Sequence, residues 1–116
     1  MKYMLLIYND PNLWETLPQE EAQGIMGEYI AFTNRIVESG EFVNGEPLQA
    51  VDTATTVKVR DGGTQTTDGP FVETKEHLGG YYVVDCKDLD RAIEIAAEIP
   101  DARYAGVEVR PVLEMG

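Results

Sequence analysis

The sequence predicts a single α+β domain, a ferredoxin-like split β-α-β sandwich with an inserted β-hairpin. Two observations predict it. Strand-like and helix-like segments follow one another in the order β-α-β, hairpin, β-α-β. The two segments that this topology places in the middle of the sheet are apolar on both faces, whereas the weaker strands fall at its edges. With 116 residues, the chain can form one such domain over residues 1–116 but not two ordinary ones.

The first β-α-β unit begins with the run Tyr3 to Tyr8, which is apolar or aromatic throughout and is typical of a buried central strand. A helix is expected to begin near Thr16, which can act as its N-cap, because apolar residues then recur at helical spacing. Gly40 is a natural stop for this helix. Phe42 to Leu48 follows as a weak strand interrupted by glycine.

Between the two units, the sequence predicts a hairpin. Thr55 to Arg60 alternates and is rich in β-branched residues, so we expect a half-buried strand there. Asp61-Gly62-Gly63 signals a turn, after which Thr64 to Thr67 can return antiparallel. Asp68 to Phe71 then interrupts the regular structure.

The second β-α-β unit begins with Tyr81 to Cys86, a strongly β-prone and largely apolar segment that is expected to be the other central strand. Asp88 can cap the helix that follows, and Pro100 ends it. Val107 to Arg110 alternates and forms the last strand, which the topology places at an edge.

The first strand has an apolar surface that two helices cannot cover. Its odd-numbered residues 3, 5 and 7 point to one face of the sheet, and Met4, Leu6 and Tyr8 point to the other. Leaving three large side chains exposed forfeits roughly 1.5–3 kcal/mol each. The sequence therefore predicts a homodimer packed sheet to sheet. The alternative is a monomer in which the inserted hairpin folds over its own sheet.

The composition narrows the range of partners. Nine Lys and Arg against 21 Asp and Glu give a formal net charge of −12, and such a surface repels nucleic acids and anionic lipids. One Cys and one His exclude an internal disulfide and multi-cysteine or poly-histidine metal sites, so no metal and no cofactor are expected. No apolar run approaches the ~20 residues that span a bilayer, and the N-terminal run is too short for a signal peptide. We therefore expect a cytoplasmic protein.

The segment Thr67 to Tyr81 holds the densest cluster of chemically active side chains. It contains three carboxylates, a lysine and the only histidine of the chain. A histidine titrates near pH ~6.5 and can move a proton near neutrality if a carboxylate orients it. We therefore take Asp68 and His77 as the candidate catalytic acid–base pair. The alternative is a structural or surface role for this histidine.

The same segment supplies the candidate ligand contacts. Gly69-Pro70 fixes a bend, and Gly79-Gly80 allows close approach to the backbone. The candidate ligand-binding residues are Gly69, Pro70, Phe71, Glu73, Lys75, Gly79, Gly80 and Tyr81. The alternative is a simple turn, with Phe71 in the core and the charged side chains in solvent. Trp14, in the loop after the first strand, either lines a pocket rim or packs on a partner subunit.

With its run Asp68-Gly69-Pro70-Phe71, the chain closely resembles the DGPF-domain proteins of the YCII-related family. The segments that carry the resemblance cover nearly the whole chain and are Lys2–Tyr8, Thr55–Gly62, Asp68–Phe71, Glu73–Glu76, Leu78–Tyr82 and Val107–Val112. The resemblance implies a ferredoxin-like subunit that forms a dimeric α+β barrel. It implies little about activity.

The resemblance also bears on catalysis and partners. In the broader YCII-related group, a His–Asp pair has been proposed as a catalytic centre, with its histidine near the first helix. Residues 9–26 of this chain contain no histidine, so the pair cannot be carried over, and only His77 could substitute from a different position. Some members of the family are encoded beside extracytoplasmic-function sigma factors, which would suit a protein partner in transcription regulation.

Three function classes follow. The first is a binding or sensing protein that holds a small organic molecule in a cleft between two subunits, in a regulatory role. The alternative is an enzyme that performs acid–base chemistry on a small organic substrate in that cleft, with Lys75 or Tyr81 stabilising developing negative charge. The third is a module that binds a protein partner through its acidic surface.

Overall fold

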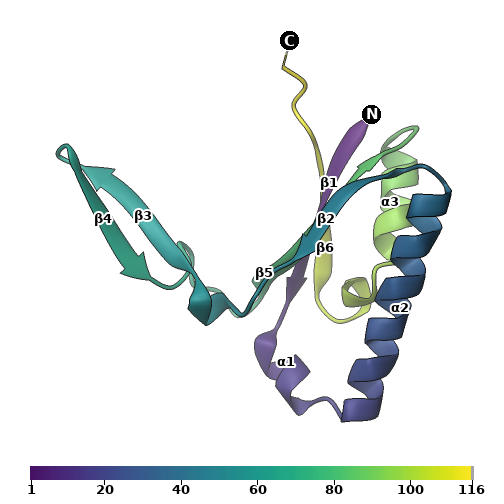
Figure 1. Cartoon of the computed structure of the whole chain (residues 1–116), viewed down its shortest axis with the longest axis horizontal. Helices are drawn as coiled ribbons and strands as arrows, with labels where there is room; N and C mark the ends of the chain where they lie inside the picture. Colours follow the sequence, from purple (N-terminus) through teal and green to yellow (C-terminus); the bar gives the residue numbers. More distant parts are fainter. Residues whose placement is uncertain (116) are drawn as a thin grey trace.

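The computed structural model, which describes residues 1–115, contains a four-stranded antiparallel sheet with its helices on one side (Figure 1). The strands, in the sheet order β2-β5-β1-β6, are β2 (Phe42–Pro47), β5 (His77–Asp85), β1 (Lys2–Asn9) and β6 (Gly106–Pro111). The two crossovers contain helices α2 (Gln19–Glu38) and α3 (Leu89–Ala97). The predicted ferredoxin-like fold is confirmed, with β1 and β5 in the middle of the sheet.

The core lies between the sheet and the helices. Tyr3, Leu5 and Ile7 of β1 are buried on this side. Residues opposite one another in an antiparallel pair share a face, so Val84 and Tyr82, which pair with Tyr3 and Leu5, also point toward the helices. The helices contribute the buried side chains Ile25, Phe32, Ile36, Ala92, Ile95 and Ala96. The β5 strand begins four residues earlier than the sequence predicts, at His77 rather than Tyr81.

The other side of the sheet is a second apolar surface that no helix within residues 1–115 covers. Met4 and Leu6 of β1 lie there beside their partners Val83 and Tyr81 of β5. Met4, Leu6 and Tyr81 keep part of their surface exposed. We call these four side chains the open face. The prediction that β1 is apolar on both faces is confirmed.

The connection from β1 to α2 differs from the prediction. Residues Pro11–Thr16 form a short helix, α1, which begins where Asp10 accepts a hydrogen bond from the Asn12 backbone N–H at 2.9 Å. The Thr16 hydroxyl donates to the Leu13 carbonyl inside α1, so the prediction that Thr16 caps the long helix is wrong. Asp10 followed by proline is a favoured helix start, and it uses the residues that the sequence analysis assigned to a loop.

No helix among residues 1–115 is long and apolar enough to span a lipid bilayer.

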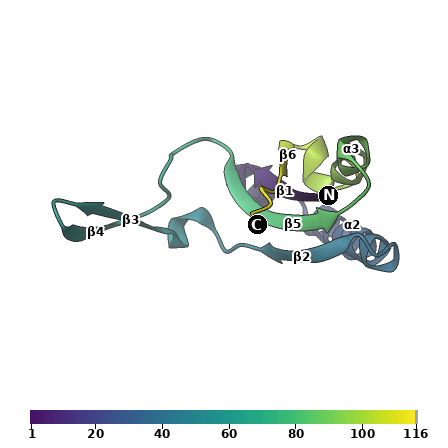
Figure 2. The same ribbon diagram turned by 90° about the horizontal axis from the view of Figure 1, so that it is seen from above.

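The inserted hairpin projects from the body of the molecule as an arm, as Figures 1 and 2 show from two directions. It consists of β3 (Thr55–Arg60) and β4 (Gly63–Asp68) and follows the short 3-10 helix η1 (Val51–Thr53). Val57 and Val59 are 60% and 61% exposed, so the expected half-burial of this strand is wrong. The alternative in which the hairpin covers its own sheet is also wrong. The radius of gyration, 16.2 Å, exceeds the roughly 13 Å of a compact chain this long.

The base of the hairpin is closed by Gly69 of the DGPF run. Gly69 has φ +107°, a conformation that other residues rarely adopt. Its backbone N–H donates to the Ala54 carbonyl at 2.7 Å, and its carbonyl accepts from the Thr56 hydroxyl at 2.8 Å. The glycine of this motif therefore holds the two ends of the arm together.

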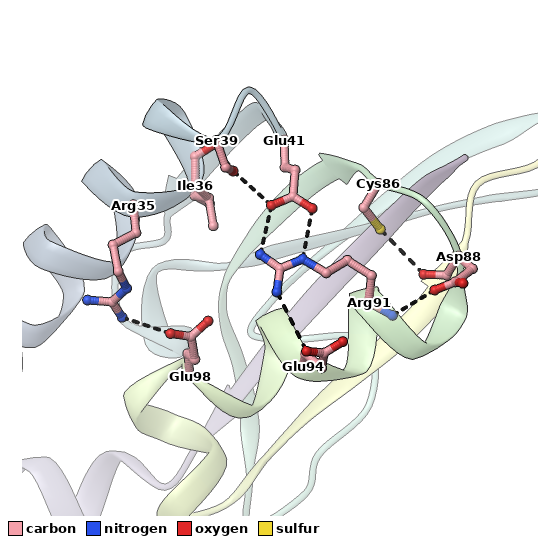
Figure 3. A network of polar contacts seen from close by, with 9 residues as sticks. All are labelled: Arg35, Ile36, Ser39, Glu41, Cys86, Asp88, Arg91, Glu94 and Glu98. Carbon is pink, nitrogen blue, oxygen red and sulfur yellow. Dashed lines mark hydrogen bonds and ion pairs between the residues drawn. The ribbon is translucent and has the colours of Figure 1, made fainter.

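A network of polar contacts joins the end of α2, the start of β2 and the first turns of α3 (Figure 3). The Arg91 guanidinium donates two hydrogen bonds of 2.9 Å to the Glu41 carboxylate, which also accepts from the Ser39 hydroxyl. The hydrogen bonds from Arg91 hold the pKa of Glu41 below its ordinary value. As predicted, Asp88 caps α3 by accepting from the Arg91 backbone N–H. Arg91 therefore links α3 to the connection between α2 and β2 through a single side chain.

We predict that Arg91→Leu lowers the free energy of unfolding by about 1–3 kcal/mol, because Glu41, whose side chain is only 16% exposed, loses a charge-assisted bidentate partner. Arg35→Leu is the matched control. Arg35 pairs with Glu98 at 3.3 Å, and both side chains are about half exposed, so its loss should cost ~0.5 kcal/mol or less. Urea unfolding of both variants tests this, and equal effects would contradict the assignment.

Candidate functional site

The predicted acid–base pair lies in one hollow on the surface. Asp68 and His77 both line a concavity of about 410 Å³ at the root of the hairpin, together with Gly69, Pro70 and Glu73. Asp68 is exposed and His77 is half-buried. Within residues 1–115 they form no hydrogen bond with each other that would orient the histidine. An acid–base role for this pair stays a prediction.

The other predicted contacts lie in different places. Lys75 lines a second concavity of about 530 Å³ with Tyr8 and Glu108, and its ammonium is 4.0 Å from Asp10 Oδ2. Phe71 is 72% exposed, and the ammonium of Lys58 lies 5.4 Å from the centre of its ring. Residues that are close in sequence around the DGPF run are thus distributed over several surfaces.

Gly79, Gly80 and Tyr81 line a third cavity, of about 500 Å³, between α1, α2, β2 and β5 on the helix side of the sheet. Among its lining residues, the aromatic side chains on the helix side are those of Trp14, Tyr29, Phe42 and Tyr82, whereas the Tyr81 side chain lies on the open face. Ile7, Ile25 and Met26 add aliphatic surface, and Asp101 adds a carboxylate. We call this cavity the helix–sheet pocket.

The two glycines allow the chain to pack closely at the wall of this pocket. Gly79 is the extra residue of a bulge, because Ile7 pairs with Gly80 whereas Tyr8 pairs with Leu78. A Cβ atom on Gly79 would lie 2.3 Å from Nδ2 of Asn9, and one on Gly80 would lie 3.1 Å from the Glu46 carbonyl oxygen. A side chain at position 79 would require the Asn9 side chain to move, and one at position 80 would require the neighbouring backbone at Glu46 to shift slightly.

Asp101 is the central polar group of the helix–sheet pocket. It lies in the 3-10 helix η2 (Pro100–Arg103) and is 3% exposed, the one buried charged residue in the described part of the chain. The Tyr29 hydroxyl donates to its Oδ2 at 2.5 Å. Asp101 Oδ1 and Trp14 Nε1 are both buried, and neither has a hydrogen-bond partner among residues 1–115. We call these two atoms the open pair.

Burial is the main influence on the pKa of the Asp101 carboxyl. Loss of water raises the pKa of the Asp101 carboxyl, against the opposing effects of the Tyr29 hydrogen bond, the nearby Trp14 indole N–H and the charge of Arg103. Burial and the bond to Asp101 also raise the pKa of Tyr29, so this phenol stays protonated and remains a donor. The carboxylate is therefore held by one donor and kept away from water.

A second chain of hydrogen bonds fixes the floor of the pocket. The Thr33 hydroxyl donates to the Tyr29 carbonyl at 2.9 Å and lies 2.7 Å from the Tyr82 hydroxyl. Because the Thr33 proton is used toward Tyr29, the Tyr82 hydroxyl is the donor in the second bond. Phe32 meets the Tyr82 ring edge to face, with centroids 5.2 Å apart. The aromatic walls are thus held in defined positions before any ligand arrives.

The sequence analysis missed Asp101, Tyr29 and Thr33 as site residues. Tyr29 lies on the apolar stripe of the helix, where an aromatic residue is indistinguishable from core. Asp101 follows a proline at a helix end, where an acidic residue is usually an exposed turn residue. The contact between them spans 72 positions in sequence. Trp14 was considered as a rim residue, and the structure places it in the lining of the helix–sheet pocket.

The fold and the site define a ferredoxin-like α+β domain with an aromatic pocket between its helix layer and its sheet. The chain belongs to the YCII-related family, because the family model of the YCII-related domain matches residues 1–116. An uncharacterised protein from Rhizobium meliloti is 35% identical over 114 residues, which cover 97% of this chain and 92% of that protein.

A solved structure supports the fold assignment. It is 5-chloro-2-hydroxyhydroquinone dehydrochlorinase (TftG) from Burkholderia phenoliruptrix in complex with 2,5-dihydroxybenzoquinone. The two chains have a TM-score of 0.52 and 13% sequence identity, and the match covers 99% of this chain and 96% of the dehydrochlorinase. At this identity, the similarity establishes a shared fold.

We predict that Asp101 makes folding pH-dependent in a defined direction. Its pKa is raised in the folded state, so the folded protein binds this proton more tightly than the unfolded chain does. At a pH below the ordinary aspartate pKa of about 3.9, Asp101 makes its full contribution to the stability of the folded protein. That contribution is lost as the pH rises through the raised pKa that Asp101 has in the folded state. Asp101→Asn, which can still accept from Tyr29, should gain stability relative to the natural protein across that window.

Thermal unfolding from pH ~4 to ~7 measures this difference. Asp52→Asn is the control, because it removes an exposed carboxylate instead of a buried one. A difference between the natural protein and Asp101→Asn that stays constant with pH would contradict the prediction.

Proposed function

We propose that this protein is a homodimer that binds a small, largely apolar organic molecule in the helix–sheet pocket of each protomer. The observation that carries the binding function is the open pair, two buried atoms of residues that line a cavity formed mainly by aromatic and aliphatic side chains. Small-molecule sites combine an apolar lining with a few polar groups in fixed positions. The cavity volume of about 500 Å³ lies within their usual range.

This proposal moves the ligand from a cleft between subunits, which the sequence analysis expects, to a pocket within each protomer. The reason is energetic. Buried polar groups are normally paired, and a buried donor and acceptor left without partners destabilise the protein until a ligand or water pairs with them. The exposed hollow around Asp68 and His77 has no such unmet requirement, since water reaches Asp68.

The comparisons are consistent with a small-molecule function. The dehydrochlorinase of similar fold acts on a substituted hydroquinone and was solved with a dihydroxybenzoquinone. An enzymatic function for this chain stays a second prediction, as do a cytoplasmic location and a protein partner in transcription regulation.

We predict that naphthalene and naphthol, used as neutral aromatic probes, bind the natural protein and that Met26→Trp weakens binding about tenfold or more. Met26 lines the pocket and is 62% exposed, so a larger side chain there obstructs the pocket while remaining tolerated at the surface. Ile30→Trp is the matched control, since Ile30 is 59% exposed on the same helix and does not line the pocket. Saturation-transfer NMR measures binding. Failure of both probes to bind, or equal weakening by both substitutions, would overturn the proposed site.

Two observations support the homodimer. The open face is apolar and no helix within residues 1–115 lies over it; Met4, Leu6 and Tyr81 stay partly exposed there, and exposed apolar patches mark interaction surfaces. The hairpin arm extends from the body with Val57 and Val59 exposed, although an isolated two-stranded hairpin is only marginally stable in water. A second copy supplies both a cover for the open face and a surface for the arm.

We predict that the natural protein sediments at twice the chain mass of 12.9 kDa at micromolar concentration and that Leu6→Lys produces a monomer. The substitution places a charge in the middle of the open face, where a sheet-to-sheet interface would desolvate it. Glu38→Lys makes a comparable change on the exposed surface of α2 and should leave the dimer intact. A natural protein that sediments as a single chain would rule out the dimer and leave the pocket within the protomer unaffected.

A further inference from the structure

The chemistry of the open pair restricts what the helix–sheet pocket can hold. In its ionised form, Asp101 presents Oδ1 as an acceptor, while its other oxygen already accepts from Tyr29. Trp14 Nε1 is a donor only. The indole N–H is close enough to favour the ionised carboxylate, yet the two atoms do not complete a hydrogen bond with each other. A single group that pairs with both atoms must therefore donate to one of them and accept from the other.

A hydroxyl group meets this requirement, since it carries one donor and two acceptor lone pairs. An ammonium group has three donors and no acceptor, so it would leave Trp14 Nε1 unpaired. A carboxylate has no donor and would lie against Asp101. The charged side chains that line the pocket, within the described part of the chain, are Glu46 and Asp101, and no Lys or Arg lines it. The pocket therefore disfavours anionic ligands.

The aromatic walls of the helix–sheet pocket indicate the shape of the rest of the ligand. Aromatic rings from α1, α2, β2 and β5 surround the cavity, and aromatic pairs prefer offset-stacked or edge-to-face contacts with another ring. Hydrogen bonds and the edge-to-face contact with Phe32 fix the Tyr82 ring in advance. A flat ring can contact several of these walls at once without the entropy cost of ordering a flexible chain.

We infer that the ligand of this pocket is a phenol-type molecule, an uncharged aromatic ring whose hydroxyl bridges the open pair by donating to Asp101 Oδ1 and accepting from Trp14 Nε1. The inference rests on the proposed function, because it names the ligand class of the same pocket. Tyr29 is a positioning residue in this arrangement. Its hydroxyl holds Asp101 Oδ2 and so leaves Oδ1 to receive the ligand.

The test compares ring probes that differ at one substituent, all on the natural full-length protein. The probes are naphthol, methoxynaphthalene, naphthalene, naphthylmethylamine and naphthoic acid, and calorimetry or ligand-observed NMR gives their affinities. Naphthol should bind about tenfold more tightly than its methyl ether, which can accept but cannot donate and therefore leaves Asp101 Oδ1 unpaired. Naphthoic acid should bind most weakly of the set.

Trp14→Phe provides an independent readout, because it removes the N–H and keeps an aromatic ring. It should reduce the affinity for naphthol severalfold and leave the affinity for naphthalene within about twofold, since naphthalene makes no hydrogen bond. Tyr104→Phe is the matched control. It removes the hydroxyl of a residue that is 43% exposed and outside the pocket lining, and it should change neither affinity.

The outcomes separate this inference from the proposed function. If naphthol, its methyl ether and naphthalene bind equally, a water molecule rather than a ligand hydroxyl occupies the open pair, and the inference fails while the binding function stands. If naphthylmethylamine binds more tightly than naphthol, the ligand is an amine and the inference is also wrong. If no probe binds, both the inference and the proposed function fail.

Discussion

The structure depends on one constraint: helices cover a single face of a sheet whose central strands are apolar on both faces. On the helix side, Tyr3, Leu5 and Ile7 are buried in one core cluster with side chains of the helices. On the other side, Met4 and Leu6 are only partly buried, and no helix within residues 1–115 lies over that face.

The helix layer is also incomplete, and this is where the pocket forms. Helix α3 is short, and the 3-10 helix η2 follows it and turns Asp101 inward beneath α2. The short helix α1 brings Trp14 to the same place from the other end of the first crossover. Three segments distant in sequence thus meet at Tyr29 and enclose a carboxylate. A fully packed helix layer would bury only apolar side chains at this place. The buried Asp101 carboxyl has a hydrogen-bond partner at only one of its two oxygens, so it lowers the stability of the fold in exchange for a polar group at this position.

The sequence predicts the fold well because its signals are local and agree with one another. Strand order, the two central strands, the turn at Asp61-Gly62 and the cap of α3 by Asp88 all follow from periodicity and turn chemistry over a few residues. The errors arise where two local readings compete or where no local signal exists. Asp10 and Thr16 are both acceptable caps, and the choice depends on how the chain leaves β1. The alternation in Thr55–Arg60 indicates a strand with one apolar face and cannot indicate whether anything in the same chain covers that face.

The helix–sheet pocket could not be predicted from the sequence, for a related reason. Chemically active residues that are close in sequence drew attention to the DGPF run, yet Gly69 there has a structural role in closing the hairpin, and the surrounding side chains lie on separate surfaces. The helix–sheet pocket is instead assembled from residues that look ordinary one at a time: a tyrosine on a helix stripe, a tryptophan in a connection and an aspartate after a proline. Their significance lies in burial and in unmatched hydrogen-bonding capacity, and both are properties of the folded chain. A charged group that is 3% exposed needs more partners than Tyr29 alone supplies, and that deficit is the reason for proposing this pocket as the functional site.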